Sequence, residues 1–123
     1  MNKAQPIPDG LLVDIILNRV TQPDCKAAGF ILSGFPKTSA QASALKKAGV
    51  ETLIVGGIVT NGGVASTVRG AHVRGLKTLV LSDGCAAFTP QAHNAAIGSL
   101  ATVSAVSTCA EAIKEIEQSE SES

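Results

Sequence analysis

The sequence has very few aromatic residues and no excess of either charge. Its 123 residues include no Trp, no Tyr and 3 Phe, and 10 Lys and Arg balance 10 Asp and Glu. Proteins that bind single-stranded nucleic acid stack bases on aromatic side chains, and those that bind duplexes or acidic membrane surfaces rely on excess positive charge. We therefore expect no nucleic-acid partner and no membrane partner.

Long apolar runs and paired cysteines are also missing. No apolar run approaches the roughly 18–20 residues of a membrane span, and no signal-peptide pattern follows Met1. The sequence has an odd number of cysteines, Cys25, Cys85 and Cys109, and they do not have the spacing of a metal site. We expect a cytoplasmic protein with free thiols, no metal and no cofactor. Cys25 follows Pro23 in a predicted loop, so we expect it to be the most reactive thiol.

Small apolar residues, with 12 glycines among them, follow a pattern that alternates between helical and strand-like spacing. The spacing predicts helices over residues 11–21, 38–48, 62–74, 90–100 and 110–118, and strands over 29–35, 52–58, 77–81 and 105–108. The order α-β-α-β-α-β-α-β-α predicts an α/β fold, Rossmann-like in part, with a four-stranded parallel sheet and right-handed crossovers.

Four parallel strands in sequence order would carry all three crossover helices on one face of the sheet. The other face would be covered by the first and last helices or by another subunit, which gives a three-layer or an open two-layer sandwich. We expect a partly exposed apolar sheet face and a homodimer formed through it. A chain of this length forms one domain, which we place at residues 1–118, and residues 119–123 are predicted to be a disordered acidic tail.

The first third of the chain contains a specific run of residues. Residues 29–38 read Gly-Phe-Ile-Leu-Ser-Gly-Phe-Pro-Lys-Thr, with Gln41-Ala42 after them and Pro-Asp-Gly-Leu-Leu at 8–12 before them. Over residues 6–47 the chain resembles a fragment of adenylate kinase. The resemblance implies a nucleotide-binding remnant: Gln41 matches the glutamine that reads the adenine of AMP, and Lys37 replaces an arginine that grips its phosphate. Lysine keeps the charge but loses the planar bidentate fork.

The remainder of a kinase is not found. Ser33 stands where the family carries the aspartate associated with the Mg-nucleotide, and the sequence contains no Gly-x-x-x-x-Gly-Lys-Ser/Thr loop to hold a triphosphate. We expect no phosphoryl transfer, and weak AMP binding is left as an alternative function.

The second part of the chain carries a different pattern. Residues 49–61 read Gly-Val-Glu-Thr-Leu-Ile-Val-Gly-Gly-Ile-Val-Thr-Asn, and residues 82–88 read Ser-Asp-Gly-Cys-Ala-Ala-Phe. Over residues 48–118 the chain resembles the C-terminal half of an isochorismatase-like hydrolase. The resemblance implies a cis peptide bond in the turn around Ile58-Val59-Thr60, where it helps to form an oxyanion hole. Glycines and backbone amides at this strand end favour an anion or a small molecule, and the expected binding residues are Gly57, Ile58, Val59, Thr60, Asn61, Gly62 and Gly63.

The catalytic groups that the resemblance implies are mostly replaced. Many members use a cysteine at the helix start together with an aspartate and a lysine, and the position of that cysteine is Gly63 here. Isochorismatases proper also carry glycine there, but they need a carboxylic acid. Asp83 is the one carboxylate expected at this edge of the sheet, so it is the candidate catalytic acid, although an Asp before Gly84 also shapes turns. His93 matches a family position where we expect a capping or packing role, and His72 is expected to face solvent.

Two partial folds from different families therefore meet near residues 44–49. We predict a chimeric or truncated α/β scaffold, natural or constructed, without catalytic activity. The main alternative is an isochorismatase-like hydrolase of small molecules that lacks the cysteine nucleophile, uses Asp83 and completes its site across a dimer.

Overall fold

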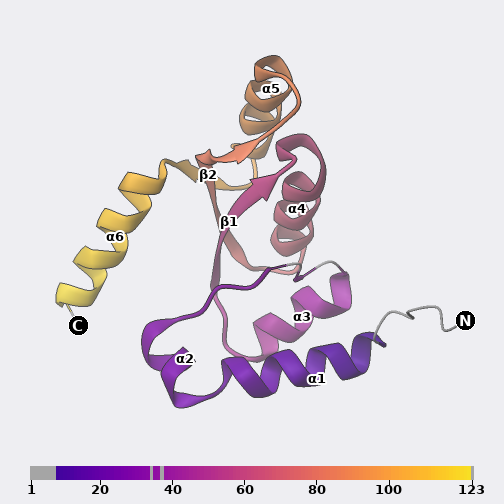
Figure 1. Cartoon of the computed structure of the whole chain (residues 1–123), viewed down its shortest axis with the longest axis vertical. Coiled ribbons are helices and arrows are strands. Elements are labelled where there is room, and N and C mark those ends of the chain that lie inside the picture. The colour runs from indigo at the N-terminus through magenta and orange to yellow at the C-terminus, as the bar shows by residue number, and fades with distance from the viewer. Residues whose placement is uncertain (1–7, 34, 37, 123) are drawn as a thin grey trace, which may run out of the picture. The chain divides into compact units, whose positions relative to one another are not determined.

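The computed structural model describes residues 8–122 with the exception of Gly34 and Lys37 (Figure 1). The chain divides into two compact units, Met1–Val50 and Glu51–Ser123. The boundary between them follows closely on the join between the two resemblances, which the sequence placed at residues 47 and 48. The single domain expected over residues 1–118 stays a prediction.

The described part of the first unit is helical. It contains α1 (Asp9–Val20), α2 (Pro23–Ala28) and α3 (Ser39–Lys47). Helices α1 and α3 pack together, and Leu45, with no exposed surface, and Val20, 5% exposed, are among its buried residues. The side chain of Thr38 caps α3 by accepting the Gln41 backbone N–H at 3.2 Å. The helices predicted over 11–21 and 38–48 are confirmed to within two residues at each end.

The strand predicted over residues 29–35 is wrong in the residues that the structure describes, and the sheet has three strands instead of four. Helix α2 ends at Gly29, whose φ of 82° favours glycine, and Ile31 is 97% exposed. An apolar run becomes a strand only where a neighbouring strand completes its hydrogen bonds. In the described chain β1 pairs with β2 and β2 with β3, all in the second unit, and no described residue of the 29–35 run belongs to a strand.

The second unit is built on a parallel sheet. Its strands are β1 (Thr52–Ile58), β2 (Lys77–Ala86) and β3 (Ala105–Ser107), in the order β1-β2-β3. The register is irregular between Val55 and Gly57, and beyond it β1 pairs again with the far end of β2, Gly57 with Cys85 and Ile58 with Ala86. This second pairing explains why β2 extends five residues past its predicted end at Leu81.

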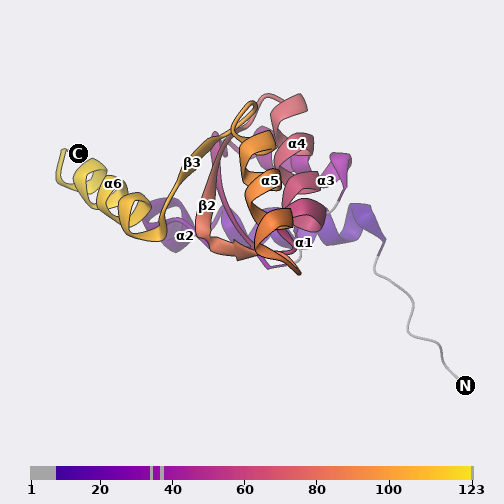
Figure 2. The ribbon, with the colours of Figure 1, turned by 90° about the horizontal axis from the view of Figure 1, so that it is seen from above.

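Four helical segments accompany the sheet. They are a π-helical turn η1 (Thr60–Val64), α4 (Ala65–Val73), α5 (Pro90–Leu100) and α6 (Cys109–Glu122). Helices α4 and α5 lie on the same face of the sheet (Figure 2), as right-handed crossovers between strands in sequence order require. Helix α6 continues to Glu122, into the residues 119–123 that were expected to form a disordered acidic tail; Ser123 lies outside the described residues, and the tail stays a prediction.

The core of the second unit lies between the sheet and α4 and α5. Val64, Val68, Val80 and Leu100 form its buried cluster, and Val55 packs against them. Each fully buried Val or Leu side chain stabilises the fold by about 1.5–3 kcal/mol relative to an exposed one. This cluster fixes the strand ends and helix starts that form the candidate site.

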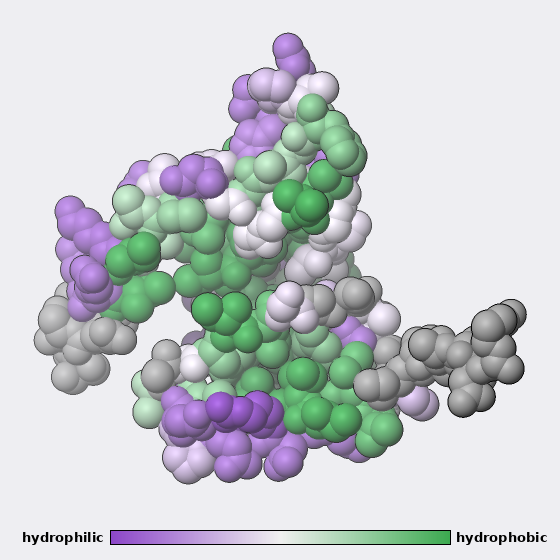
Figure 3. All heavy atoms as spheres, viewed as in Figure 1, coloured by the Kyte–Doolittle hydropathy of each residue, from purple (hydrophilic) through white to green (hydrophobic). Residues whose placement is uncertain are grey.

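The opposite face of the sheet is less covered. Side chains alternate along a strand, and since Val55 points into the core, Ile54 points to the other face, where it is 46% exposed. Helix α6 exposes Ile113 and Ile116 in the same unit. Figure 3 shows apolar residues gathered over the sheet and on the neighbouring part of α6. Ile54 is thus partly exposed on this face, and the homodimer through it stays a prediction.

Candidate functional site

The turn that follows β1 brings the predicted binding residues together. The peptide bond between Ile58 and Val59 is cis, where the family resemblance placed it, and Gly57 has a φ of 127°, which a residue with a side chain rarely adopts. The Val59 carbonyl then accepts the backbone N–H groups of Gly62, at 3.0 Å, and Val64, at 3.2 Å. Residues 57–63 thus form one strand-to-helix turn at the carboxyl end of β1.

The two glycines of this turn, Gly62 and Gly63, differ in the room that each leaves for a Cβ atom. A Cβ atom at Gly63 would lie 3.5 Å from the Ile58 carbonyl oxygen, an ordinary contact distance. A Cβ at Gly62 would lie 2.8 Å from Cγ2 of Val59, closer than real Cβ contacts. The turn therefore has room for a side chain at position 63, where the cysteine of other members would stand, but not at position 62.

A hydrogen bond joins this turn to α5. Oγ1 of Thr60 lies 2.7 Å from Nδ1 of His93, and Thr60 has no exposed surface. His93 is in the first turn of α5, which Thr89 caps by accepting the Ala92 N–H at 3.0 Å. The two residues are 33 positions apart. Sequence reasoning named both but did not pair them, because their contact depends on how η1 and α5 pack together.

The Asp83 side chain contacts the start of α6. Its Oδ1 accepts the backbone N–H of Cys109 at 2.7 Å, so it binds the start of α6. This hydrogen bond holds the pKa of Asp83 below its ordinary value, which keeps the carboxylate ionised at neutral pH. A general acid must carry a proton, and the contact with Cys109 stabilises the form that has none. The catalytic role of Asp83 stays a prediction.

The native cysteines of this unit are poor nucleophiles. Burial raises the pKa of the Cys85 thiol, whose Sγ lies 4.0 Å from the Val55 carbonyl oxygen. The neighbouring Asp83 carboxylate raises the pKa of Cys109. The thiolate is the reactive form of cysteine, so both thiols are disfavoured as nucleophiles at neutral pH.

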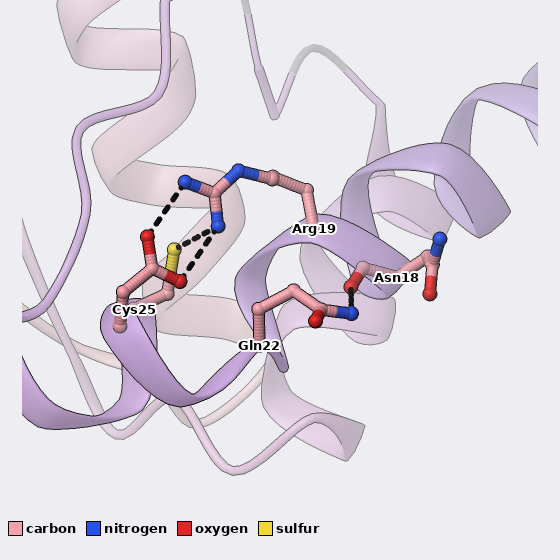
Figure 4. Close-up of polar contacts among 5 residues, drawn as sticks. Asn18, Arg19, Gln22 and Cys25 are labelled. Carbon is pink, nitrogen blue, oxygen red and sulfur yellow. Dashed lines mark hydrogen bonds and ion pairs between the residues drawn. The ribbon is translucent and has the colours of Figure 1, made fainter.

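Cys25 lies in a polar cluster of the first unit (Figure 4). Arg19 donates two hydrogen bonds to the Asp24 carboxylate, at 2.9 and 2.8 Å, and one to Sγ of Cys25 at 3.1 Å. The bidentate contact lowers the pKa of Asp24 to about 2. Cys25 is in α2 and only 8% exposed, so the prediction that it is an accessible loop thiol is wrong: Pro23 starts a short helix that buries it.

The residues expected to bind AMP are only partly described. Lys37 lies outside the described residues. Gln41 is in the first turn of α3 and 3% exposed, so little of its side chain is accessible to a nucleotide. A role for either residue in binding stays a prediction.

The described residues offer neither a cluster of metal ligands nor a membrane-spanning helix. Within that range no group of three or more His, Cys, Asp or Glu side chains is placed to hold a metal ion. None of the helices found there is long and apolar enough to span a membrane.

Comparison with known proteins finds two relationships, and neither covers the whole chain. Adenylate kinases from Methanocella arvoryzae and Acetivibrio thermocellus are 53% and 56% identical to it over 45 residues, which is 37% of this chain and 20% of each kinase. The chain thus spans about a fifth of the length of these relatives. A segment resembling adenylate kinase is therefore present, without the greater part of that enzyme.

The larger relationship covers the sheet. The solved structure of an isochorismatase-like hydrolase from Alkaliphilus metalliredigens matches with a TM-score of 0.60 and 32% identity, over 67% of this chain and 45% of that one. The family model for the isochorismatase domain matches residues 31–112. This range is more than half of the chain and contains β1, β2, β3 and the whole candidate site. By its sequence and by its fold, the chain belongs to the isochorismatase family.

Proposed function

We propose that this chain is an isochorismatase-family α/β scaffold, chimeric or truncated in composition, that holds the binding turn of the family without hydrolysing a substrate. The proposal is supported by the residues at two positions, that of the family's cysteine nucleophile and that of the candidate catalytic acid. Gly63 offers no nucleophile, and Asp83 is committed, in its ionised form, to the N–H of Cys109.

The contact between Asp83 and Cys109 carries this proposal. A carboxylate whose oxygen accepts a backbone N–H at 2.7 Å is stabilised without a proton, and protonation would weaken the cap of α6. The family's acid-catalysed reaction needs the protonated form at the moment of bond cleavage. The same hydrogen bond that secures the helix thus opposes the catalytic role.

Turnover by the purified full chain tests the proposal. We expect no reaction above the uncatalysed rate with isochorismate, a vinyl ether, or with nicotinamide, a small amide. Turnover that Asp83→Asn abolishes, and that the matched exposed variant Asp24→Asn leaves unchanged, would overturn the proposal and establish the alternative, a hydrolase that uses Asp83 as its acid.

A second candidate function is weak AMP binding by the first unit. The identity of more than half over 45 residues with adenylate kinases favours it, and the sequence assigns the contacts to Lys37 and Gln41. Because Gln41 is 3% exposed, binding through its amide requires the start of α3 to open. Calorimetric titration with AMP should then give heat that Gln41→Ala reduces, and a flat titration of the unmodified chain removes this candidate.

A further inference from the structure

The buried hydroxyl of Thr60 determines the state of His93. Thr60 has no exposed surface, and among the described residues its side chain makes a single hydrogen bond, to Nδ1 of His93. A hydroxyl has one proton to donate, and a buried proton without an acceptor costs about 1–3 kcal/mol. The arrangement that satisfies it is donation from Oγ1 of Thr60 to an unprotonated Nδ1.

This direction of donation fixes the tautomer of the imidazole. A neutral imidazole has one N–H, so if Nδ1 accepts, the proton is on Nε2. Nε2 makes no hydrogen bond to any residue that the structure describes, and the His93 side chain is half-buried rather than enclosed. The Nε2–H group of His93 is therefore a hydrogen-bond donor that has no partner among the described residues. It lies beside the turn that follows β1.

Apolar side chains are exposed at the same edge of the sheet. Ile58, the last residue of β1, is 77% exposed and pairs in register with Ala86 of β2. Phe88, two residues beyond Ala86, is 92% exposed. A hydrogen-bond donor on α5, whose start directly follows Phe88, together with exposed apolar side chains at the same edge of the sheet, matches a ligand with an acceptor oxygen at one end and an apolar body at the other.

We propose that His93 is a ligand-binding residue, held by Thr60 as the Nε2–H tautomer so that Nε2 donates a hydrogen bond to the carboxylate or carbonyl oxygen of a small, partly apolar ligand. Thr60 is the positioning residue of the pair, since it acts on the ligand only through the imidazole. This role goes beyond the scaffold proposed above and requires no catalysis.

The tautomer is measured by ¹⁵N NMR of the imidazole nitrogens in the full chain. His72, the only other histidine, is exposed on α4 and serves as the internal reference. The neutral imidazole of His93 should show a single Nε2–H tautomer, whereas that of His72 should show the mixture of a solvated ring. Thr60→Val, which replaces the hydroxyl by a methyl group of similar size, should release His93 to a mixture, and Thr60→Ser should keep it fixed.

Binding is measured with benzoate and benzamide as probes, and benzyl alcohol as the control that lacks the acceptor carbonyl. Benzoate should shift the Nε2 signal of His93 and leave His72 unmoved. His93→Phe should weaken benzoate binding about tenfold, the effect of one hydrogen bond to a charged group. His72→Asn should change nothing, and Thr60→Val should weaken binding by a smaller factor.

Each outcome decides the proposal. A mixed tautomer at His93 in the unmodified chain overturns it, and so does benzoate binding of equal strength in His93→Phe. Failure of both benzoate and benzamide to move His93 overturns it as well. If His93→Phe does not fold, the comparison of Thr60→Val with Thr60→Ser still decides the result. None of these results bears on the scaffold proposal, which fails only if turnover is observed.

Discussion

A cysteine introduced at Gly63 should be tolerated, whereas a cysteine at Gly62 should not. Both glycines lie in η1 and neither has a positive φ, so the backbone conformation permits a side chain at both positions. The difference lies in the space around the new Cβ. The nearest atom to it is 3.5 Å away at position 63, the Ile58 carbonyl oxygen, and 2.8 Å away at position 62, Cγ2 of Val59.

The expected magnitudes follow from these distances. Replacing glycine where the native backbone is compatible stabilises a protein by about 0.4–1 kcal/mol, because the unfolded chain loses freedom. Forcing extra atoms into a packed position costs about 1–3 kcal/mol, and Val59 cannot turn away easily because its side chain is β-branched. In a domain of this size 1 kcal/mol shifts the Tm by about 4–8 °C. Gly62→Cys should therefore lower the Tm by about 5–20 °C, and Gly63→Cys should leave it unchanged or slightly raised.

The new thiol at position 63 should also be the most reactive one in the second unit. It would lie at a helix start, where backbone N–H groups stabilise a thiolate. The pKa values of Cys85 and Cys109 are raised, by burial and by the Asp83 carboxylate respectively. Alkylation by iodoacetamide at pH 7, followed by peptide mass spectrometry, should modify position 63 first.

Thermal unfolding followed by circular dichroism, together with this alkylation, checks the prediction. Equal losses of Tm in the two variants would refute the reasoning from the turn geometry. Alkylation of Cys85 or Cys109 before position 63 would refute the argument that the turn still favours a thiolate.

Three further predictions concern other contacts. Asp83→Ala should destabilise the second unit at neutral pH, since Cys109 loses its cap. The stabilisation by Asp83 is fully present above its unfolded pKa near 3.8 and is lost as pH falls through its lower folded pKa, so in urea unfolding the variant and the unmodified chain should differ more at pH 6.5 than at pH 2.5. The Asp24 carboxyl should titrate near pH 2 by NMR and return toward 3.8 in Arg19→Gln; an unchanged midpoint would contradict the bidentate contact. If the sheet face forms a homodimer, light scattering should show a mass that rises with concentration and that Ile54→Lys reduces to the monomer, whereas a monomer at every concentration would contradict it.

The elements that sequence predicts well carry their own start and stop signals. Helix α5 has the predicted bounds, Pro90–Leu100, because Thr89 caps its first turn and Pro90 suits its first position. Strand β1 also has its predicted bounds, since its apolar, β-branched run leads into a turn at Gly57, whose φ of 127° favours glycine. The decisive interactions of α5 lie within a few residues along the chain, whereas β1 also needs its pairing with β2.

The predictions that fail depend on interactions between distant segments. Residues 29–35 have the composition of a buried strand, but composition cannot supply the neighbouring strand that would complete the hydrogen bonds. The charge of residues 119–123 favours a disordered tail in the sequence, whereas α6, predicted over 110–118, extends to Glu122 in the structure. The sequence places Asp83 near the carboxyl end of a strand. The hydrogen bond that it accepts from the Cys109 N–H, 26 residues away, depends on the packing of β2 against the start of α6.

Two long-range hydrogen bonds tie the carboxyl edge of the sheet to helix starts. Thr60 with His93, and Asp83 with Cys109, each join a residue at this edge to the start of a helix. Removing either contact should loosen the fold whether or not a reaction takes place at this edge. A nucleophile at position 63 has no such structural role, because the turn closes through the Val59 carbonyl and the N–H groups of Gly62 and Val64. The hydrogen bonds that close this turn therefore do not depend on which side chain stands at position 63.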